Sequence, residues 1–339
     1  SSGIAAFYCL LEAMKLCSDR REVVLPAYTA GSLVVAVRKA GLVPVLCDIE
    51  ADSVNTRADV YRAAVTAQTL AVVPVHLFGL PVEGIETLRE QLPEQVFCIE
   101  DCAQAMGTMI SGKAAGTFSD AAIFSFNRGK NLSLGAGGYA QIFSERLKKI
   151  FPSPPASMHA TGGSVFTMAA LSVAANRFLY GLLYPLIARY KETAPPEDVS
   201  VGVLSRFQSA LGCRVYPSRE DDFSARFSNG MKLCQGLRDC AGIGIVDVRA
   251  CDRPVFNRFP LMCYDQDMRQ RIQDALWRSG IESSRMYLRP LHHMFKLGYS
   301  PEAFPHAVML AERLLTVPVH QRVTANDIDT MITCIRVVT

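Results

Sequence analysis

The sequence lacks the cysteine and histidine spacings that metal sites and disulfide frameworks require. Its 11 cysteines are scattered, with no Cys-x-x-Cys pair and no His-x-x-x-His partner. Neither a zinc site nor a disulfide-rich fold is therefore indicated. An odd number of cysteines, in a chain without a secretory leader, is typical of the reducing cytosol, so we expect a cytoplasmic protein. We expect its thiols to be small buried hydrophobes.

A strong charge of one sign is also missing. The 35 lysines and arginines nearly balance the 32 aspartates and glutamates, which leaves a net charge of +3 at pH 7. There is no dense basic run, so we expect no nucleic-acid partner. No GxGxxG turn follows the first expected strand, which argues against a dinucleotide-dependent dehydrogenase.

The chain has no initiator methionine. Residues 1–6 already read as the start of a helix, so we expect a further segment before them. A length of 339 residues, half of them apolar, suits a large α/β domain with a smaller second domain. We predict a large domain over residues 1–150, a divergent apolar insertion or linker over 151–200, and a smaller α+β domain over 201–339.

Residues 1–150 alternate helical patterns with short β-branched runs. This alternation predicts right-handed crossovers and a mainly parallel sheet. The expected strands are 22–25, 43–47, 69–75, 95–99, 121–126 and 139–143. The expected helices are 5–17, 31–40, 58–66 and 83–92. Ligands gather at the carboxyl ends of such strands, so the residues that follow them are site candidates.

Residues 151–200 break this alternation. Prolines and glycines precede an apolar stretch, 165–188, that approaches transmembrane length. Asn176 and Arg177 lie in its middle, and a charge at the bilayer centre is costly, so a spanning helix is the weaker interpretation. A helix pair buried in an oligomer contact, or peripheral contact with a membrane face, is favoured.

Residues 201–339 predict a compact α+β unit. We expect helices at 205–212, 223–237 and 266–279 and a strand at 257–263. The closing helix begins at Thr324, an N-cap residue with Asp327 three positions later.

Two short stretches carry the chemistry. Residues 99–107 place Asp101 directly after an expected strand, and residues 124–132 place Lys130 just beyond another. Pyridoxal phosphate (PLP) chemistry requires this pair, because a lysine holds the cofactor as a Schiff base and an aspartate keeps the pyridine nitrogen protonated. A strand-end cleft would lower the pKa of Lys130 by desolvation. The alternatives are a solvated loop charge for Lys130 and the cap of a helix at 102–106 for Asp101.

Further residues fit a cofactor site. Gln104 returns to the face of Asp101, where it could bond the phenolic oxygen of the cofactor. Residues 2–5 form a small-residue turn at a helix start, which favours a phosphate, and the Ser125 hydroxyl could reach the same phosphate. Tyr28 follows another strand and could stack on a flat ring. A plain N-cap at 2–5 and a core position for Tyr28 stay open.

These stretches together resemble the DegT/StrS family of PLP-dependent sugar aminotransferases, which have the aspartate aminotransferase fold. The matches span nearly the whole chain in the expected order: 2–6, 26–29, 44–49, 74–79, 100–107, 124–138, 206–212, Tyr287 with 290–292, and 315–320. The resemblance implies an α/β protein of fold type I. Its sheet would be mainly parallel and seven-stranded with helices on both faces, beside a smaller C-terminal α+β domain.

The resemblance also implies roles for single residues. Lys130 would form the internal aldimine with PLP, and Asp101 would pair with the ring nitrogen. Gln104 would meet the phenolic oxygen and Tyr28 would stack on the ring. The phosphate would be held by Gly3, Ile4, Ala5 and Ser125.

The implied reaction has two halves. An amino-acid donor, commonly glutamate, would convert the cofactor to its pyridoxamine form, and a keto group on a nucleotide-linked sugar would then take the nitrogen. Lys130 would shuttle the proton. The product would serve polysaccharide or glycoconjugate synthesis, and a homodimer would share each active site at the subunit boundary.

The sequence departs from the family pattern at four places. Ile4 replaces a usual threonine and Ala136 a usual glutamate. The Gly-Tyr-Asn-like element that reaches the neighbouring subunit's cofactor is not recognisable in 199–205, and the apolar stretch 165–188 replaces a polar region. Two rivals stay open: a PLP-dependent sugar dehydratase, which typically has histidine at the position of Lys130, and a non-catalytic protein of this fold that binds a partner or a membrane through 165–188.

Overall fold

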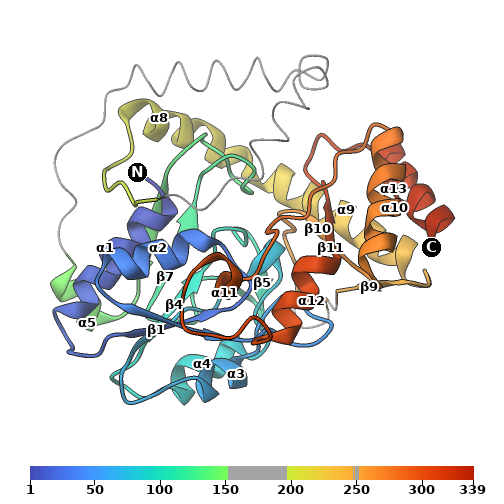
Figure 1. The fold of residues 1–339 in the computed structure, drawn as a ribbon. Helices are drawn as coiled ribbons and strands as arrows, with labels where there is room; N and C mark the ends of the chain where they lie inside the picture. The colour runs from blue at the N-terminus through green and yellow to red at the C-terminus, as the bar shows by residue number, and fades with distance from the viewer. Residues whose placement is uncertain (152–196, 247, 249–251) are drawn as a thin grey trace.

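The computed structural model describes residues 1–151, 197–246, 248 and 252–339. The apolar stretch 165–188 and nearly all of the predicted insertion 151–200 lie outside these residues. Figure 1 shows a large sheet with helices around it and, beside it, a smaller sheet with helices of its own.

The large sheet has six strands among the described residues, where seven were expected. Their order is β2-β1-β3-β4-β7-β8, and every neighbouring pair is parallel except β7 with β8. The predicted α/β class with a mainly parallel sheet is thereby confirmed. The strands are β1 (Glu22–Pro26), β2 (Val43–Cys47), β3 (Thr69–Val72), β4 (Phe97–Asp101), β7 (Ala121–Ser125) and β8 (Gly138–Ile142).

Helices cover both faces of this sheet (Figure 1). Successive strand residues point to opposite faces, so Val23 and Leu25 pack with α1 and α2 while Val24 packs with α3 and α4. Burial on both faces explains why the strands read as apolar runs. The helices are α1 (Gly3–Lys15), α2 (Gly31–Lys39), α3 (Ala58–Ala63), α4 (Ile85–Gln91) and α5 (Glu145–Ile150). Shorter elements are η1 (Leu77–Gly79) and the hairpin of β5 (Met109–Ile110) with β6 (Lys113–Ala114).

The smaller sheet is antiparallel, with the order β11-β10-β9. Its strands are β9 (Ile243–Ile245), β10 (Phe259–Cys263) and β11 (Leu314–Val317). The helices beside it are α9 (Arg219–Leu237), α10 (Gln266–Arg278), α12 (Pro305–Arg313) and α13 (Ala325–Val338), whereas α11 (Leu291–Met294) lies against α2 of the large sheet. Thr324 caps α13 as predicted, in a capping box with Asp327.

Helix α8 (Arg206–Val215) precedes this part of the chain, and η2 (Tyr216–Ser218) joins it to α9. Although α8 comes late in the sequence, it lies against the lysine loop region. A Cβ atom on Gly212 would stand 3.2 Å from Leu134, and one on Gly137 would clash with Leu204 at 2.4 Å. The segment before α8 also accepts hydrogen bonds from Ser1, at Ser200 and Gly202.

Some local predictions were wrong. The strand expected over 69–75 ends at Val72. Pro74, which has no N–H to donate, lies just beyond that end. The alternative of a helix at 102–106 is not realised either, because residues 103–107 form turns. Helices α5, α11 and α12 and strand β9 were not predicted. Among the described residues, no helix has both the length and the apolar character needed to cross a membrane.

Candidate active site

Asp101 and Lys130 come together at the carboxyl end of the large sheet. Asp101 ends β4 and lies opposite Ile123 of the adjacent parallel strand β7, and Lys130 lies in the loop that follows β7. The two charged groups are near enough that each shifts the pKa of the other, yet they form no ion pair with each other. An amine and a carboxylate that converge on one strand-end region are the two groups that a flat ring held by both would require.

The carboxyl of Asp101 is only 6 % exposed. Burial raises its pKa, and three influences oppose that rise: the N–H of Ala103, which donates to Oδ1 at 2.9 Å, and the charges of Lys130 and His76. The N–H contact shows that the carboxylate does order a local turn. A cation placed against it would restore the ionised form that burial disfavours.

The amine of Lys130 is placed to be a nucleophile. Burial lowers its pKa, and the charge of Asp101 opposes this fall without cancelling it. More of the amine is therefore neutral near pH 7 than in a solvated lysine. The loop before it is exposed over residues 127–129, whereas Lys130 itself is half-buried, so the solvated alternative fits the loop better than it fits Lys130.

Gln104 lies beside Asp101 and has both ends of its amide engaged. Its Oε1 accepts from the N–H of Phe78 at 2.9 Å, and its Nε2 donates to the hydroxyl of Tyr287 at 3.2 Å. The amide is thus held in one orientation by main chain on one side and by a side chain of the C-terminal part on the other. The predicted bond to a cofactor oxygen stays a prediction.

Tyr28 is completely buried, as its core alternative required. Its hydroxyl donates to the carbonyl of Tyr287 at 3.0 Å, and the two rings meet edge to face with centroids 5.6 Å apart. Burial raises the pKa of both phenols, and the nearby Asp101 carboxylate contributes to the rise at Tyr287. Tyr287, to which the sequence assigned no role, is therefore the aromatic side chain that the structure places next to Asp101.

The predicted phosphate residues gather at the start of α1. A Cβ atom on Gly3 would lie 3.2 Å from the Cβ of Ser125, and one on Gly138 would lie 2.2 Å from the nitrogen of Gly3. Ser2 caps the helix by accepting from the N–H of Ala5 at 3.1 Å. The N-cap interpretation is therefore correct, and the first turn still presents N–H groups and the positive helix end beside the Ser125 hydroxyl.

Two buried asparagines at the lysine loop were also not predicted as site residues. Asn131 and Asn257 are 5 % and 4 % exposed, and they hydrogen-bond each other, Nδ2 of Asn257 to Oδ1 of Asn131, at 3.1 Å. Only the position of Asn131 next to Lys130 could have drawn attention to it. Asn257 lies far away in the sequence, so no local signal pointed to it.

A cluster of possible metal ligands lies behind the site, at His76, Glu100 and Cys102. The donor atoms of His76 and Glu100 are already used. Nε2 of His76 bonds the Glu100 carboxylate at 3.0 Å, and Nδ1 accepts from the N–H of Val82 at 3.0 Å. Glu100 also accepts from Gly116, Phe118 and Ser119. Burial raises the pKa of Glu100, but His76, followed by the bonds from Ser119 and Gly116, lowers it below its ordinary value. The cluster links neighbouring segments through buried hydrogen bonds, and we assign it no metal.

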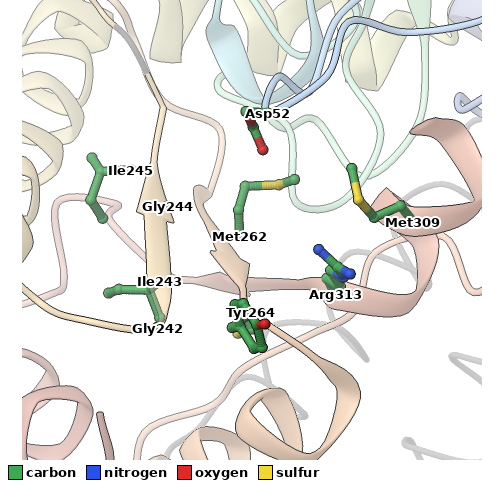
Figure 2. A pocket seen from close by; sticks show the side chains of 10 residues that line it. Asp52, Gly242, Ile243, Gly244, Ile245, Met262, Tyr264, Met309 and Arg313 are labelled. Atoms are coloured by element: carbon green, nitrogen blue, oxygen red, sulfur yellow. The ribbon is translucent and has the colours of Figure 1, made fainter.

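A cavity of about 280 Å³ lies elsewhere, between β9, the end of β10 and α12. Figure 2 shows Asp52, Met262 and Arg313 among the side chains that line it. Neither Asp101 nor Lys130 borders this cavity, so it is separate from the candidate site.

Comparisons with known proteins identify the family and agree with the fold. The sequence model of the DegT/DnrJ/EryC1/StrS aminotransferase family matches residues 1–336. The UDP-N-acetyl-3-dehydro-α-D-glucosamine 3-aminotransferase of Acidithiobacillus ferrooxidans is 28% identical over 99% of this chain and 82% of its own length. The dTDP-3-amino-3,4,6-trideoxy-α-D-glucose transaminase of Micromonospora megalomicea is 27% identical over 99% of this chain and 83% of its own. The solved sugar aminotransferase CalS13 from Micromonospora echinospora has a TM-score of 0.79 at 21% identity, covering 99% and 85% of the two chains.

Proposed function

The chain belongs to the DegT/DnrJ/EryC1/StrS aminotransferase family, and from this premise we propose that it is a PLP-dependent aminotransferase of nucleotide-linked sugars. The amino group would come from an amino acid, with glutamate expected, and would go to a keto group on the sugar. Two full-length relatives are named as enzymes of UDP- and dTDP-linked amino sugars. The product would enter polysaccharide or glycoconjugate synthesis.

The observation that carries this proposal is that the fold brings Lys130 and Asp101 together at the carboxyl ends of β7 and β4. They are near enough for each charge to shift the pKa of the other, and burial lowers the pKa of the amine and raises that of the carboxyl. These groups fit PLP, which when bound supplies an electron sink for the carbanion formed at the amino-bearing carbon. The start of α1 and Ser125 would hold its phosphate.

The chain's own residues would each have a separate role in binding the cofactor and moving the proton. Lys130 would bind the cofactor through its Nζ and, when released, would take and return a proton at the reacting carbon. Asp101 would keep a proton on the ring nitrogen by its charge. Gln104 and Tyr28 would fix the position of the ring, Gln104 through an amide that Phe78 and Tyr287 already orient.

The wider organisation is also part of the proposal. We propose a large domain over 1–150, a smaller domain over 201–339, and a homodimer whose active sites lie at the subunit boundary. The cytoplasmic location and any membrane contact through 165–188 stay predictions. The dehydratase alternative is not favoured, because Lys130 stands where those relatives typically have histidine, and the non-catalytic alternative is not favoured by the family match.

A screen of keto nucleotide-sugars tests this function. The pyridoxamine form of the protein is mixed with UDP-, dTDP- and GDP-linked keto sugars, and return of the aldehyde form is followed by absorbance. We expect one sugar class to react and Lys130→Ala to lower the rate by at least about a hundredfold. Lys113→Ala, at an exposed lysine of β6, should react like the unaltered protein. If Lys130→Ala keeps the visible absorbance of lysine-bound cofactor, the assignment of Lys130 is wrong.

A further inference from the structure

We propose that Asn257 is a positioning residue that sets the place of Lys130. Asn257 is 4 % exposed and directly precedes the small-sheet region, two residues before β10. Its Nδ2 donates to the carbonyl of Gly129 at 2.6 Å and to Oδ1 of Asn131 at 3.1 Å. One amide therefore holds the residue before Lys130 and the residue after it. The proposal rests on the proposed function, because it concerns the lysine that would hold the cofactor.

Asn131 extends this contact to the strand end that bears Asp101. Its Nδ2 lies within hydrogen-bond distance of three carbonyls, those of Gln104 at 3.3 Å, Met106 at 3.1 Å and Val255 at 3.0 Å. The amide network thus fixes the lysine loop relative to the loop that carries Asp101 and Gln104. A change in it alters the distance between the amine and the carboxylate.

Asn257 can set a position only if it is itself anchored, and its backbone is. Its N–H donates to the carbonyl of Phe78 at 2.9 Å, and its carbonyl accepts from Nη1 of Arg226 at 2.9 Å. Arg226 is in turn paired with Asp222, one turn earlier in α9, at 2.7 Å. The backbone of Asn257 is therefore tied both to η1, through Phe78, and to α9, a helix of 19 residues, through Arg226.

The part of the loop before Lys130 needs such an anchor because apolar packing does not hold it, although Leu132 and Leu134 after it are buried. Residues 127–129 are exposed, and Gly129 has a left-handed backbone (φ 73°) with nothing within 4 Å of an added Cβ atom. The part-buried bond from Asn257 to the Gly129 carbonyl is costly to lose on the Asn257 side, because that side chain is only 4 % exposed and would keep a buried polar group with one partner fewer.

The alternative is that Asn257 only satisfies buried polar groups. Asn229 supplies the control: it is 8 % exposed and lies in α9, and its Nδ2 donates to the carbonyls of Val319 and Val323 at 3.3 Å each. It has the same side chain and a similar burial, and its bonds go to the chain before α13. Asn229→Ala should cost stability without touching the lysine loop.

The experiment compares Asn257→Ala, Asn257→Asp and Asn229→Ala in the full chain. The readouts are the dissociation constant of added PLP, the pH midpoint at which the visible absorbance of the lysine-bound cofactor changes, and Tm. We expect both changes at Asn257 to weaken PLP binding by roughly tenfold, about 1.4 kcal/mol, and to move the pH midpoint. Asn229→Ala should lower Tm and leave the other two values unchanged.

Each outcome either supports or overturns the proposal that Asn257 positions Lys130. Asn257→Asp keeps the side-chain volume and removes the amide donors, so it serves as the test if the alanine variant does not fold. If the changes at Asn257 lower only Tm, or if Asn229→Ala weakens PLP binding equally, the residue is merely structural and the inference is overturned. If the unaltered protein binds no PLP, the proposed function fails instead.

Discussion

At the scale of single residues, the site depends on Asp101 and Lys130, each of which shifts the pKa of the other. Burial pushes the pKa of Asp101 up and that of Lys130 down, so both would be neutral more often than in water. Their mutual attraction opposes this in both cases. The charge state of the pair is therefore tuned by distance, which is why the residues that set the distance matter.

This coupling predicts a pH effect for Asp101→Asn. Asp101 raises the pKa of Lys130, whose value already lies below the ordinary 10.5. Removing the negative charge lets the pKa fall further, so the neutral amine is present from a lower pH. The rate at which the protein without cofactor captures PLP should rise with pH in both proteins, with the midpoint at lower pH in the variant. Its affinity for PLP at equilibrium should fall, because the ring nitrogen loses its partner.

The control for that prediction is Asp120→Asn, which alters a carboxylate paired with Arg89 near the other end of β4. Its capture midpoint should match that of the unaltered protein. A midpoint that rises in Asp101→Asn would contradict the sign of the coupling.

At the scale of elements, the sequence predicted the parts of the fold whose causes are local. The six strands of the large sheet and the helices between them were predicted to within a few residues. The four inner strands are buried on both faces and read as continuous apolar runs, whereas β8 at the edge is only partly buried. Thr324 as the cap of α13 was also correct. The helix α12 was missed, and the reason is physical.

The cap of α12 comes from a distant part of the chain. Asp48, just after β2, accepts from the N–H groups of Ala307 at 2.9 Å and His306 at 3.1 Å. The residue directly before the helix, Phe304, has a left-handed backbone and offers no side-chain cap. The local start signal is therefore limited to Pro305 at the first helical position, with no side-chain cap beside it. Asn257 was not singled out, and Tyr287 was matched to the family pattern without a role, because their partners in the site lie far away in sequence.

Asp48→Ala should destabilise the protein by about 1 to 2 kcal/mol, the usual cost of losing a helix cap. The loss should be concentrated in α12, so amide hydrogen exchange over 305–313 should speed up more than elsewhere. Thr324→Ala removes the local cap of α13 and should have its effect over 325–338 instead. Equal exchange in α12 before and after the change at Asp48 would show that the cap contributes nothing.

At the scale of the whole molecule, the C-terminal part is bonded directly to the strand ends of the large sheet. Leu291 donates to the carbonyl of Ala27 at 2.8 Å, and Tyr299 accepts from the N–H of Leu46 at 2.9 Å. The residues predicted to hold the cofactor all lie in 1–150. Tyr287 and Asn257 of the C-terminal part hydrogen-bond to these residues or to their neighbours, so the geometry of the candidate site depends on both parts.

The described regions should therefore unfold together and be stabilised together. PLP added at 100 times its dissociation constant should raise the free energy of unfolding by about 2.7 kcal/mol. Calorimetry should show one transition that moves to a higher temperature. Inorganic phosphate at the same concentration is the control. Two transitions, of which only one moves with PLP, would mean that the cofactor site belongs to one part alone.

The contact between Asn257 and the Gly129 carbonyl joins positions 128 residues apart. During synthesis on a ribosome, Lys130 and its loop emerge long before Asn257 does. A growing chain would therefore expose Lys130 before the hydrogen bond that positions its loop can form. The anchor must then emerge from the exit tunnel before the coenzyme can be retained. Acquisition of the coenzyme would follow translation, and stalled chains that end before residue 257 should lose it on washing.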